Sequence, residues 1–279
     1  MTAKKISISD LVFRIILFLW GIGILFPLGW VFYQSLKTNN EFFMNVWKFP
    51  AKPQWNNYAT AWNELNIGTS YLNTFIYVGV SMLLGLFITT ISAYAFSRLN
   101  WRGKKALWKT IMLSAFLPGT STMAPLYVIM RNLHLLNSIS GLIIVSSFGE
   151  NVFLMMLLSG FMKSIPKEIE ESAYIDGASF FKIYRKIILP LSTPGIVTCG
   201  LFMFMGLYNN FIFPLICLSD PEKYTITVNM YEAYQAMQFH ADWTALCAGT
   251  VIAMIIPIIV YIFFQKQIVE GATLGAIKS

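Results

Sequence analysis

The sequence predicts an all-α, polytopic membrane protein with six transmembrane helices. Of its 279 residues, 56% are hydrophobic and 12% are charged, and this is about half the charged share of a typical soluble domain. The charges leave long, nearly uncharged runs between them, and a run of about 20 residues crosses the ~30 Å hydrocarbon layer once as a helix. These runs lie within residues 15–36, 65–97, 110–130, 135–162, 187–219 and 243–265.

The first run predicts a span over about residues 12–36. It is longer than the apolar core of a signal peptide and no small-residue cleavage site follows it, so we expect it to remain as a span. The loop after it contains Trp47, Trp55 and Trp62 among prolines and asparagines. These aromatic side chains either anchor the loop among lipid headgroups or form a docking surface for a partner outside the cell.

The second and fifth runs are too long for one crossing and need a boundary inside them. We place their spans near residues 71–96 and 191–211, because the polar cluster at residues 66–70 and the helix breaker Pro214 are typical of span edges. The third, fourth and sixth runs each have the length of one span.

The basic residues predict that both termini are cytoplasmic. An even number of spans places the two ends of the chain on one side, and cytoplasmic loops carry an excess of Lys and Arg. With this orientation most of the 20 Lys and Arg residues are inside, and the net charge of +7 reflects a basic rim facing anionic lipid rather than a nucleic-acid partner. The inner residues are Lys4, Lys5, Arg14, Arg98, Arg102, Lys104, Lys105, Lys109, Lys163, Lys167, Lys182, Arg185, Lys186, Lys266 and Lys278.

We therefore expect one transmembrane domain in the bacterial cytoplasmic membrane. It covers residues 1–279, with core spans over about 71–265, a cytoplasmic loop over 163–190 and a cytoplasmic tail over 266–279.

The inner loop at residues 163–190 predicts two short helices. Pro166 suits a first helical turn, and the glutamates that follow it place carboxylates near the positive end of the helix. Gly177 predicts the end of this helix, because glycine adopts the left-handed conformation readily. Ser179 is a typical cap for a second helix, and Pro190 is expected to bend the path into the fifth span.

Two interpretations of this loop remain open. The helices either lie in the headgroup region as amphipathic connectors or dock on another protein. The second interpretation accounts for small residues among the charges, since small side chains permit the close approach of a second surface. These residues are Ser172, Ala173, Gly177 and Ala178.

The loop resembles the cytoplasmic motif of bacterial ABC importer membrane subunits, written E-A-A, three residues, G, nine residues, I-x-L-P. Every spacing is kept, and Ser172 stands where alanine is usual. The segments 164–179, 209–215 and 263–279 further resemble the carbohydrate branch, in particular the smaller six-span subunit of maltose-type importers. The matching motif residues are Glu171, Ser172, Ala173, Gly177, Ile187, Leu189 and Pro190.

The resemblance implies that the loop forms a coupling helix, which docks in a cleft of an ATP-hydrolysing subunit. Closure of two such subunits on ATP would switch the membrane pair between inward-facing and outward-facing states. Glu171 would contact the ATPase, Ala173 would enter its cleft and Gly177 would supply the turn; the tail would also reach toward an ATPase. The implied coupling residues are Glu171, Ser172, Ala173, Asp176 and Gly177.

The resemblance also implies the partners. They are a second permease subunit, two ATP-binding subunits, an extracellular or periplasmic sugar-binding protein, a sugar substrate and membrane lipid. The chain has no G-x-x-x-x-G-K-[ST] loop for phosphate, so ATP and Mg would be bound by the ATPase, and no cofactor, catalytic residue or metal site is expected here. His134 and His240 lack further ligands at metal spacing.

A few polar residues lie deep in the predicted spans. An ionised Glu150 is costly at mid-membrane. It therefore either lines the sugar pathway, lies near the outer end of a shorter fourth helix, or serves as a protonated contact between helices. Tyr208, Asn209 and Asn210 end the fifth span, where amides and aromatic rings suit a sugar but also serve as contacts between helices.

Two other classes of protein are weaker alternatives. A secondary transporter that works without an ATPase predicts coupling-ion ligands at mid-membrane, and only Glu150 qualifies. A membrane-embedded enzyme predicts clustered His, Asp or Glu residues at depth, and the sequence has no such cluster.

Overall fold

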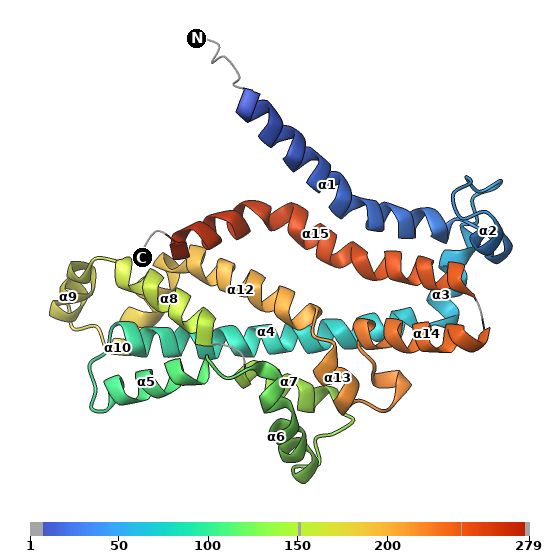
Figure 1. Cartoon of the computed structure of the whole chain (residues 1–279). Helices are drawn as coiled ribbons and strands as arrows, with labels where there is room; N and C mark the ends of the chain where they lie inside the picture. The colour runs from blue at the N-terminus through green and yellow to red at the C-terminus, as the bar shows by residue number, and fades with distance from the viewer. Residues whose placement is uncertain (1–7, 150–151, 241, 277–279) are drawn as a thin grey trace. The chain divides into compact units, whose positions relative to one another are not determined.

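A computed structural model describes residues 8–149, 152–240 and 242–276, and all regular elements within these ranges are helical (Figure 1). The contacts divide the chain into two compact units. The first comprises Met1–Gly68 and Asn229–Ile255, and the second comprises Thr69–Val228 and Ile256–Ser279. The all-α fold class is thereby confirmed, whereas the single domain over residues 1–279 stays a prediction.

The first unit contains a long apolar helix and an ordered loop. Its elements are α1 (Ile8–Ser35), α2 (Asn39–Met44), α3 (Asn56–Glu64), most of α14 (Ile226–His240) and the first part of α15 (Trp243–Ala276). None of the described residues in the most apolar window of α1 is buried. Its side chains therefore face away from the core of this chain, as expected for a helix in contact with lipid or another subunit.

The second unit contains the remaining helices, and its core lies where α4, α8, α10 and α12 meet. Gly195 permits a close approach of α12 to α8, because a Cβ atom there would lie 2.7 Å from the ring of Phe161. The side chains of Leu158, Ile183 and Cys199 are completely buried in this core. The elements are α4 (Ile67–Ser97), α5 (Lys104–Ser114), α6 (Gly119–Asn132), α7 (Ile139–Gly149), α8 (Val152–Ser164), α9 (Lys167–Ile175), α10 (Phe180–Ile183), the π-helix η1 (Tyr184–Ile188), α11 (Leu189–Leu191), α12 (Thr193–Tyr208), α13 (Ile212–Cys217), the 3₁₀ helix η2 (Pro221–Lys223) and the last part of α15.

Among the described residues, three of the six predicted runs form continuous apolar helices. Ser9–Ser35, Ile67–Ser97 and Trp243–Gln267 are long and apolar enough to cross a membrane. The other three runs are bent pairs, α5 with α6 at 103°, α7 with α8 at 49°, and Phe180–Leu191 with α12 at 76°. Six spans result if each bent pair counts as one.

Two of the bends have a visible cause in proline. Pro118 caps α6 with an extended backbone, and a proline also lies in the first turn of α12. Proline has no N–H to continue a preceding helix and its ring clashes with the carbonyl four residues earlier. The bend expected near the fifth span is confirmed, whereas the bend in the third run was not predicted.

The helix of the second run begins before the predicted span. α4 starts at Ile67, whereas the span was predicted from about residue 71; where the membrane edge lies along α4 stays a prediction. Asn66 adopts a left-handed conformation with φ 49° and so reverses the chain directly before the helix. Ser70 is completely buried within α4, which explains why its hydroxyl did not end the helix.

Loops at one end of the second unit are joined by asparagines. Asn137 donates its N–H to the carbonyl of Cys217 at 2.8 Å, and its side-chain oxygen accepts from the N–H groups of Ser219 and Asp220. Asn73 similarly donates to the carbonyl of Glu222 at 2.7 Å. Residues 217–222 follow the predicted fifth span, whereas Asn73 lies within the predicted second span and Asn137 at the start of the fourth apolar run. The membrane face of this end stays a prediction.

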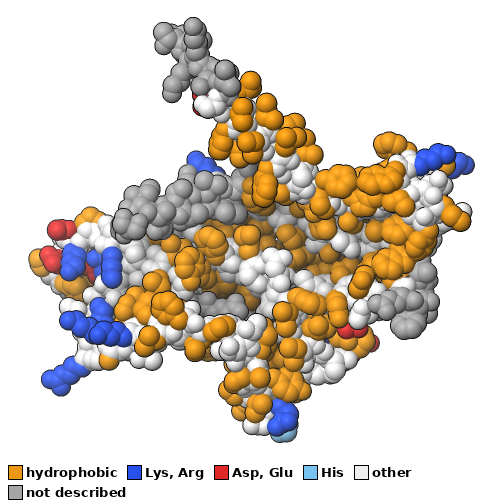
Figure 2. All heavy atoms as spheres, viewed as in Figure 1, with side chains coloured by type: hydrophobic (Ala, Val, Ile, Leu, Met, Phe, Trp, Pro, Cys, Tyr) orange, Lys and Arg blue, Asp and Glu red, His pale blue; other side chains and the backbone are white. Residues whose placement is uncertain are grey.

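The other end of the second unit carries a cluster of basic residues. Figure 2 shows Lys and Arg side chains gathered near α5, α9 and α10, whereas hydrophobic side chains cover much of the visible surface along the long helices. This end joins residue 98 to the 162–170 segment, two regions that were both predicted to be cytoplasmic. Which membrane face this end occupies stays a prediction.

Candidate functional site

The segment at residues 163–190 forms the two short helices that the sequence predicts. Pro166 caps α9, and Asp176 and Gly177 end it, with Gly177 at φ +77°. The N–H of Gly177 donates to the carbonyl of Tyr174 at 3.0 Å, so the last turn closes on itself. Ser179 then caps α10, its hydroxyl accepting from the N–H of Lys182 at 3.4 Å.

The five predicted coupling residues lie together on this segment and are mostly accessible. Glu171, Ser172, Asp176 and Gly177 are exposed, and Ala173 is half-buried. The hydroxyl of Ser172 donates to the carbonyl of Glu168 at 2.9 Å, so it is turned back onto its own helix.

Large apolar side chains flank these residues. Ile175 is 87% exposed, and Phe180 and Phe181 are also largely exposed. Exposed apolar groups beside small and charged residues are typical of a surface that another protein covers.

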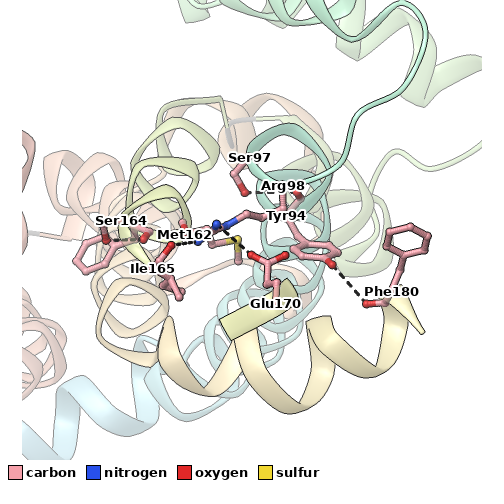
Figure 3. Close-up of polar contacts among 9 residues, drawn as sticks. Tyr94, Ser97, Arg98, Met162, Ser164, Ile165, Glu170 and Phe180 are labelled. Carbon is pink, nitrogen blue, oxygen red and sulfur yellow. Dashed lines mark hydrogen bonds and ion pairs between the residues drawn. The ribbon is translucent and has the colours of Figure 1, made fainter. Parts of the chain in front are cut away.

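The side chain of Glu170 lies on the buried face of α9. Glu170 is 7% exposed and is the buried residue of this helix. Its Oε1 atom lies 3.0 Å from Nη1 of Arg98, the residue that directly follows α4 (Figure 3). The two side chains are 9% and 3% exposed, so the pair is shielded from water.

The same guanidinium also holds the end of α8. Its Nη2 atom donates to the carbonyls of Met162 and Ile165, the latter at 2.5 Å (Figure 3). Carbonyls in the last turn of a helix lack partners within the helix and carry partial negative charge. Arg98 therefore joins α4, the end of α8 and α9 through one side chain.

Two more contacts continue this attachment along α4. The hydroxyl of Tyr94 donates to the carbonyl of Phe180 at 3.4 Å, and the hydroxyl of Tyr184 donates to Thr90 at 2.9 Å. Burial raises the pKa of Tyr174, whose phenol hydrogen-bonds with Tyr94. Figure 3 shows the Tyr94 side chain between Glu170 and Phe180.

The chain between α10 and α12 changes its helical period. Residues Tyr184–Ile188 form a π-helix directly before Pro190. A π-turn bonds residue i to i+5 and inserts an extra residue into the helix, which relieves the clash that proline makes with the carbonyl four residues earlier. Ile183, Tyr184 and Ile188 consequently face the core together.

Arg98 and Glu170 are functional candidates that the sequence analysis did not identify. It counted Arg98 as one of many inner charges and treated Glu170 as one of several carboxylates at a helix start. An arginine directly after an apolar span and two adjacent glutamates in an amphipathic helix were the available signals. They do not reveal a pair between residues that are far apart in sequence.

Tyr208 and Asn209, two of the residues predicted to line the sugar pathway, lie in different surroundings. Asn209 donates to the carbonyl of Met205 at 2.9 Å on its own helix, and Tyr208 is buried against a small apolar pocket that includes Tyr71. Glu150 lies outside the described residues.

Asn210 instead lies at a larger cavity of the second unit. This cavity has a volume of about 420 Å³ and extends along the break between α5 and α6, α7 and the start of α8. The side chain of Asn210 donates to the hydroxyl of Tyr77 at 3.1 Å, and this hydroxyl lies 2.9 Å from that of Ser146, which also lines the cavity. Gly149 and Val152, which flank the undescribed residues, line the cavity as well.

The predicted tail continues the last helix. α15 extends to Ala276, so most of residues 266–279 is helical rather than a separate segment. Whether it reaches an ATPase subunit stays a prediction.

Comparisons with known proteins agree with this architecture. The profile of the family described as "Binding-protein-dependent transport system inner membrane component" matches residues 81–272. The sulfoquinovosyl glycerol transport system permease protein SmoH of Agrobacterium fabrum is 31% identical over 256 residues, 91% of this chain and 89% of the relative. The diacetylchitobiose uptake system permease protein NgcG of Streptomyces coelicolor is 28% identical over 263 residues, 94% of this chain and 87% of the relative.

A solved structure has the same fold over nearly the whole chain. It is a chain of a bacterial ABC transporter involved in the import of the acidic polysaccharide alginate, with a TM-score of 0.80 and 26% sequence identity. The similarity covers 95% of this chain and 99% of that chain. The family profile includes residues 90–191, which carry the candidate site. This chain therefore belongs to the family of inner membrane components of binding-protein-dependent transport systems.

Proposed function

We propose that this chain is a permease subunit of an ABC importer that moves a sugar or oligosaccharide across the bacterial cytoplasmic membrane. The observation that carries the proposal is the exposed α9 with its motif residues, attached at its back to α4 and α8. The substrate class follows from relatives that are named for diacetylchitobiose and sulfoquinovosyl glycerol uptake. The secondary transporter is not favoured, because the family works with a binding protein.

In this proposal α9 receives movement from an ATP-hydrolysing partner. Glu171 contacts the ATPase, Ala173 enters its cleft and the exposed Ile175 adds apolar area to the interface. ATP binding and hydrolysis, with Mg, take place in two partner subunits, and their closure switches this chain and a second permease subunit between two states. This chain itself contributes no catalytic residue.

The pathway for the sugar follows the cavity beside Asn210. The amide of Asn210, the hydroxyl of Ser146 and the ring of Phe213 line it and offer the mixture of hydrogen-bonding groups and apolar surface that a sugar requires, and the buried hydroxyl of Tyr77 holds the first two from behind. We infer that Asn210 lines this pathway together with Glu150, whereas Tyr208 and Asn209 line a separate, smaller pocket. A binding protein outside the membrane delivers the substrate.

Reconstitution tests the proposal. The chain is purified with the second permease, the ATPase and the binding protein of its operon, and sugar uptake into proteoliposomes is measured with ATP or a non-hydrolysable analogue inside. We expect uptake only with ATP and binding protein. Uptake by this chain alone, driven by an ion gradient, would show that it is a secondary transporter.

Paired substitutions at Gly177 locate the ATPase contact. Gly177→Ala and Gly177→Trp impose the same left-handed strain, since both are L-residues at φ +77°, and nothing in this chain lies within 4 Å of the added Cβ. Only the tryptophan adds bulk on the outer surface. We expect the ATPase to co-purify with Gly177→Ala and to be lost with Gly177→Trp; equal recovery with both would remove α9 from the interface.

A further inference from the structure

Building on the proposed function, we propose that Arg98 is a positioning residue that fixes the coupling segment to the end of α4, so that the movement of α9 is transmitted to α4 rather than along the chain into α12. The proposal concerns the route of the mechanical coupling inside this subunit. It is independent of which sugar is carried.

The first argument is the burial of the contact. Arg98 and Glu170 are 3% and 9% exposed at their side chains, with 3.0 Å between Nη1 and Oε1. A buried ion pair with one partner removed leaves an uncompensated charge in a low-dielectric site. The pair therefore resists separation when a partner protein pushes on α9, unlike an exposed pair that water and salt can replace.

The second argument is the number of elements held by one side chain. Besides Glu170 of α9, the guanidinium binds the carbonyls of Met162 and Ile165. The guanidinium is rigid and planar, so Nη2, which donates to both carbonyls, and Nη1, which faces Oε1 of Glu170, keep a fixed separation. As a result α9 cannot tilt away from α8 without breaking contacts of the same residue.

The third argument is the spacing of attachments along α4. Thr90, Tyr94 and Arg98 follow one another at four-residue intervals and thus lie on one face of the helix and its continuation. They bind Tyr184, the carbonyl of Phe180 and Glu170, respectively. The whole segment from α9 to the π-helix is attached to the last turns of α4.

The covalent path into α12 is less direct by comparison. Between α10 and α12 the chain passes through the π-helix Tyr184–Ile188 and then bends by 76°. Ser192 lies at this bend and ends α11. A helix that changes period and direction transmits an axial push poorly, whereas the three attachments to α4 are lateral and short.

Substitutions that keep size but change the attachment test the proposal. Glu170→Gln removes the negative charge, Arg98→Met removes the cation with a side chain of similar length, and Arg98→Lys keeps the charge with fewer donors. Thr198→Val is the matched control, because Thr198 is a buried residue of α12 whose hydroxyl donates to the carbonyl of Pro194 at 3.0 Å. It removes a buried hydrogen bond within α12 and leaves the attachments of Thr90, Tyr94 and Arg98 in place.

The first readout is the ratio of ATPase activity with substrate-loaded binding protein to activity without it, in the reconstituted complex. Allosteric couplings are typically worth about 5-fold to 150-fold, so we expect Glu170→Gln and Arg98→Met to lower this ratio at least about fivefold, with partial recovery in Arg98→Lys. Thr198→Val should keep the ratio. A general folding defect reduces the amount of complex, not the ratio per complex.

The second readout is the distance between spin labels on α9 and α4. Labels are placed by Glu168→Cys and Leu83→Cys, at two exposed positions of α9 and α4, with Cys199, Cys217 and Cys247 replaced by alanine. We expect a narrow distance distribution in the parent and a broad one in Glu170→Gln. Because both labels lie within this chain, the distance can also be measured for a variant that yields too little complex for ATPase assays.

The outcomes separate the two proposals. If the parent complex retains its ATPase and its stimulation, but Glu170→Gln and Arg98→Met leave both the ratio and the distance distribution unchanged, the role of Arg98 is refuted. If no ATPase binds the parent chain, the proposed function itself fails. A reduced ratio in Thr198→Val equal to that in Arg98→Met would place the mechanical route in α12 and also overturn the inference.

Discussion

Two buried cations hold two different loops of this protein, one in each unit. Arg98 follows α4 in the second unit and Lys37 lies two residues after α1 in the first. Lys37 is 0% exposed, and its Nζ donates to the carbonyls of Asn45 and Val46 at 2.9 and 2.8 Å. Both residues thus fold a polar loop back onto the end of a long apolar helix.

The two cations differ in the charge of their partners. Lys37 binds neutral carbonyls and lies 4.3 Å from the centre of the Tyr33 ring, and no ion pair to a carboxylate was found for it within the described part of the chain. Arg98 has the buried carboxylate of Glu170 in addition to its carbonyls. Carbonyls released from a cation can bind water, but a buried carboxylate without its cation cannot be hydrated in place.

The comparison teaches that burial of a cation alone does not decide how firmly a loop is held. The cost of detachment depends on what the cation leaves behind. The loop held by Lys37 can rearrange at a moderate cost in free energy. The segment held by Arg98 cannot, because its detachment leaves the buried carboxylate of Glu170 without a cation. This difference agrees with a structural role for the loop held by Lys37 and with transmission of movement by the segment held by Arg98.

The largest effect is expected for Arg98→Met. Removing one partner of a buried ion pair typically costs about 3 to 5 kcal/mol, because Glu170 would remain charged and buried. The free energy of unfolding in mixed detergent micelles should fall by that amount. The double variant Arg98→Met with Glu170→Met should recover most of the loss, since replacing both partners by apolar groups is often neutral; an equal loss in the double variant would contradict the ion-pair explanation.

Lys37→Met is expected to have a smaller effect. It removes two hydrogen bonds from a charged donor and a contact with the Tyr33 ring, and hydrogen bonds of this kind contribute about 1.5 to 3 kcal/mol when buried. Asn45 and Val46 are exposed residues, so water can replace the lost donor and we expect about 1 kcal/mol. Limited proteolysis of residues 38–54 should accelerate, with Lys48→Met, an exposed lysine of the same loop, as the control. A loss as large as that of Arg98→Met would refute the distinction.

Much of the fold could be predicted from the sequence because hydropathy and end signals are local. The positions of the spans, the glycine end of α9 and the serine cap of α10 are all encoded in short stretches of residues. The same information does not give direction, so the 103° bend between α5 and α6 was missed although Pro118 lies in it. A proline indicates a break but not the packing that orients the next helix.

The anchor of the candidate site could not be predicted for a related reason. Glu168, Glu170 and Glu171 are equivalent as carboxylates near a helix start, and only packing against α4 selects Glu170 as the buried one. Arg98 likewise resembled any basic residue after a span. The exposed motif residues were identifiable because their spacing is local, whereas their support depends on contacts across 72 residues of sequence, from Arg98 to Glu170.

The smallest expected effect concerns pH and the loop that Lys37 holds. The N–H groups of Thr38 and Ala51 donate to the carboxylate of Glu41 and lower its pKa from the ordinary value of 4.5, and the charge of Lys37 contributes less. A carboxyl group with a lowered pKa stabilises the folded loop above its unfolded pKa, and this contribution is lost as the pH falls through the folded value. The loop should therefore loosen only below about pH 4.5.

A spin label at Phe43→Cys, a position that is 58% exposed on α2, measures this loosening. Its mobility should stay constant from about pH 7 down to the ordinary glutamate pKa of 4.5 and rise below it. In Glu41→Gln the label should be more mobile at neutral pH and insensitive to acid, because the amide cannot accept as strongly from the two N–H groups. If the acid response persists in Glu41→Gln, a different carboxylate controls the loop. The capping interaction between Thr38 and Glu41 then does not set the stability of the loop, and the contacts of Lys37 with its carbonyl partners remain as its support.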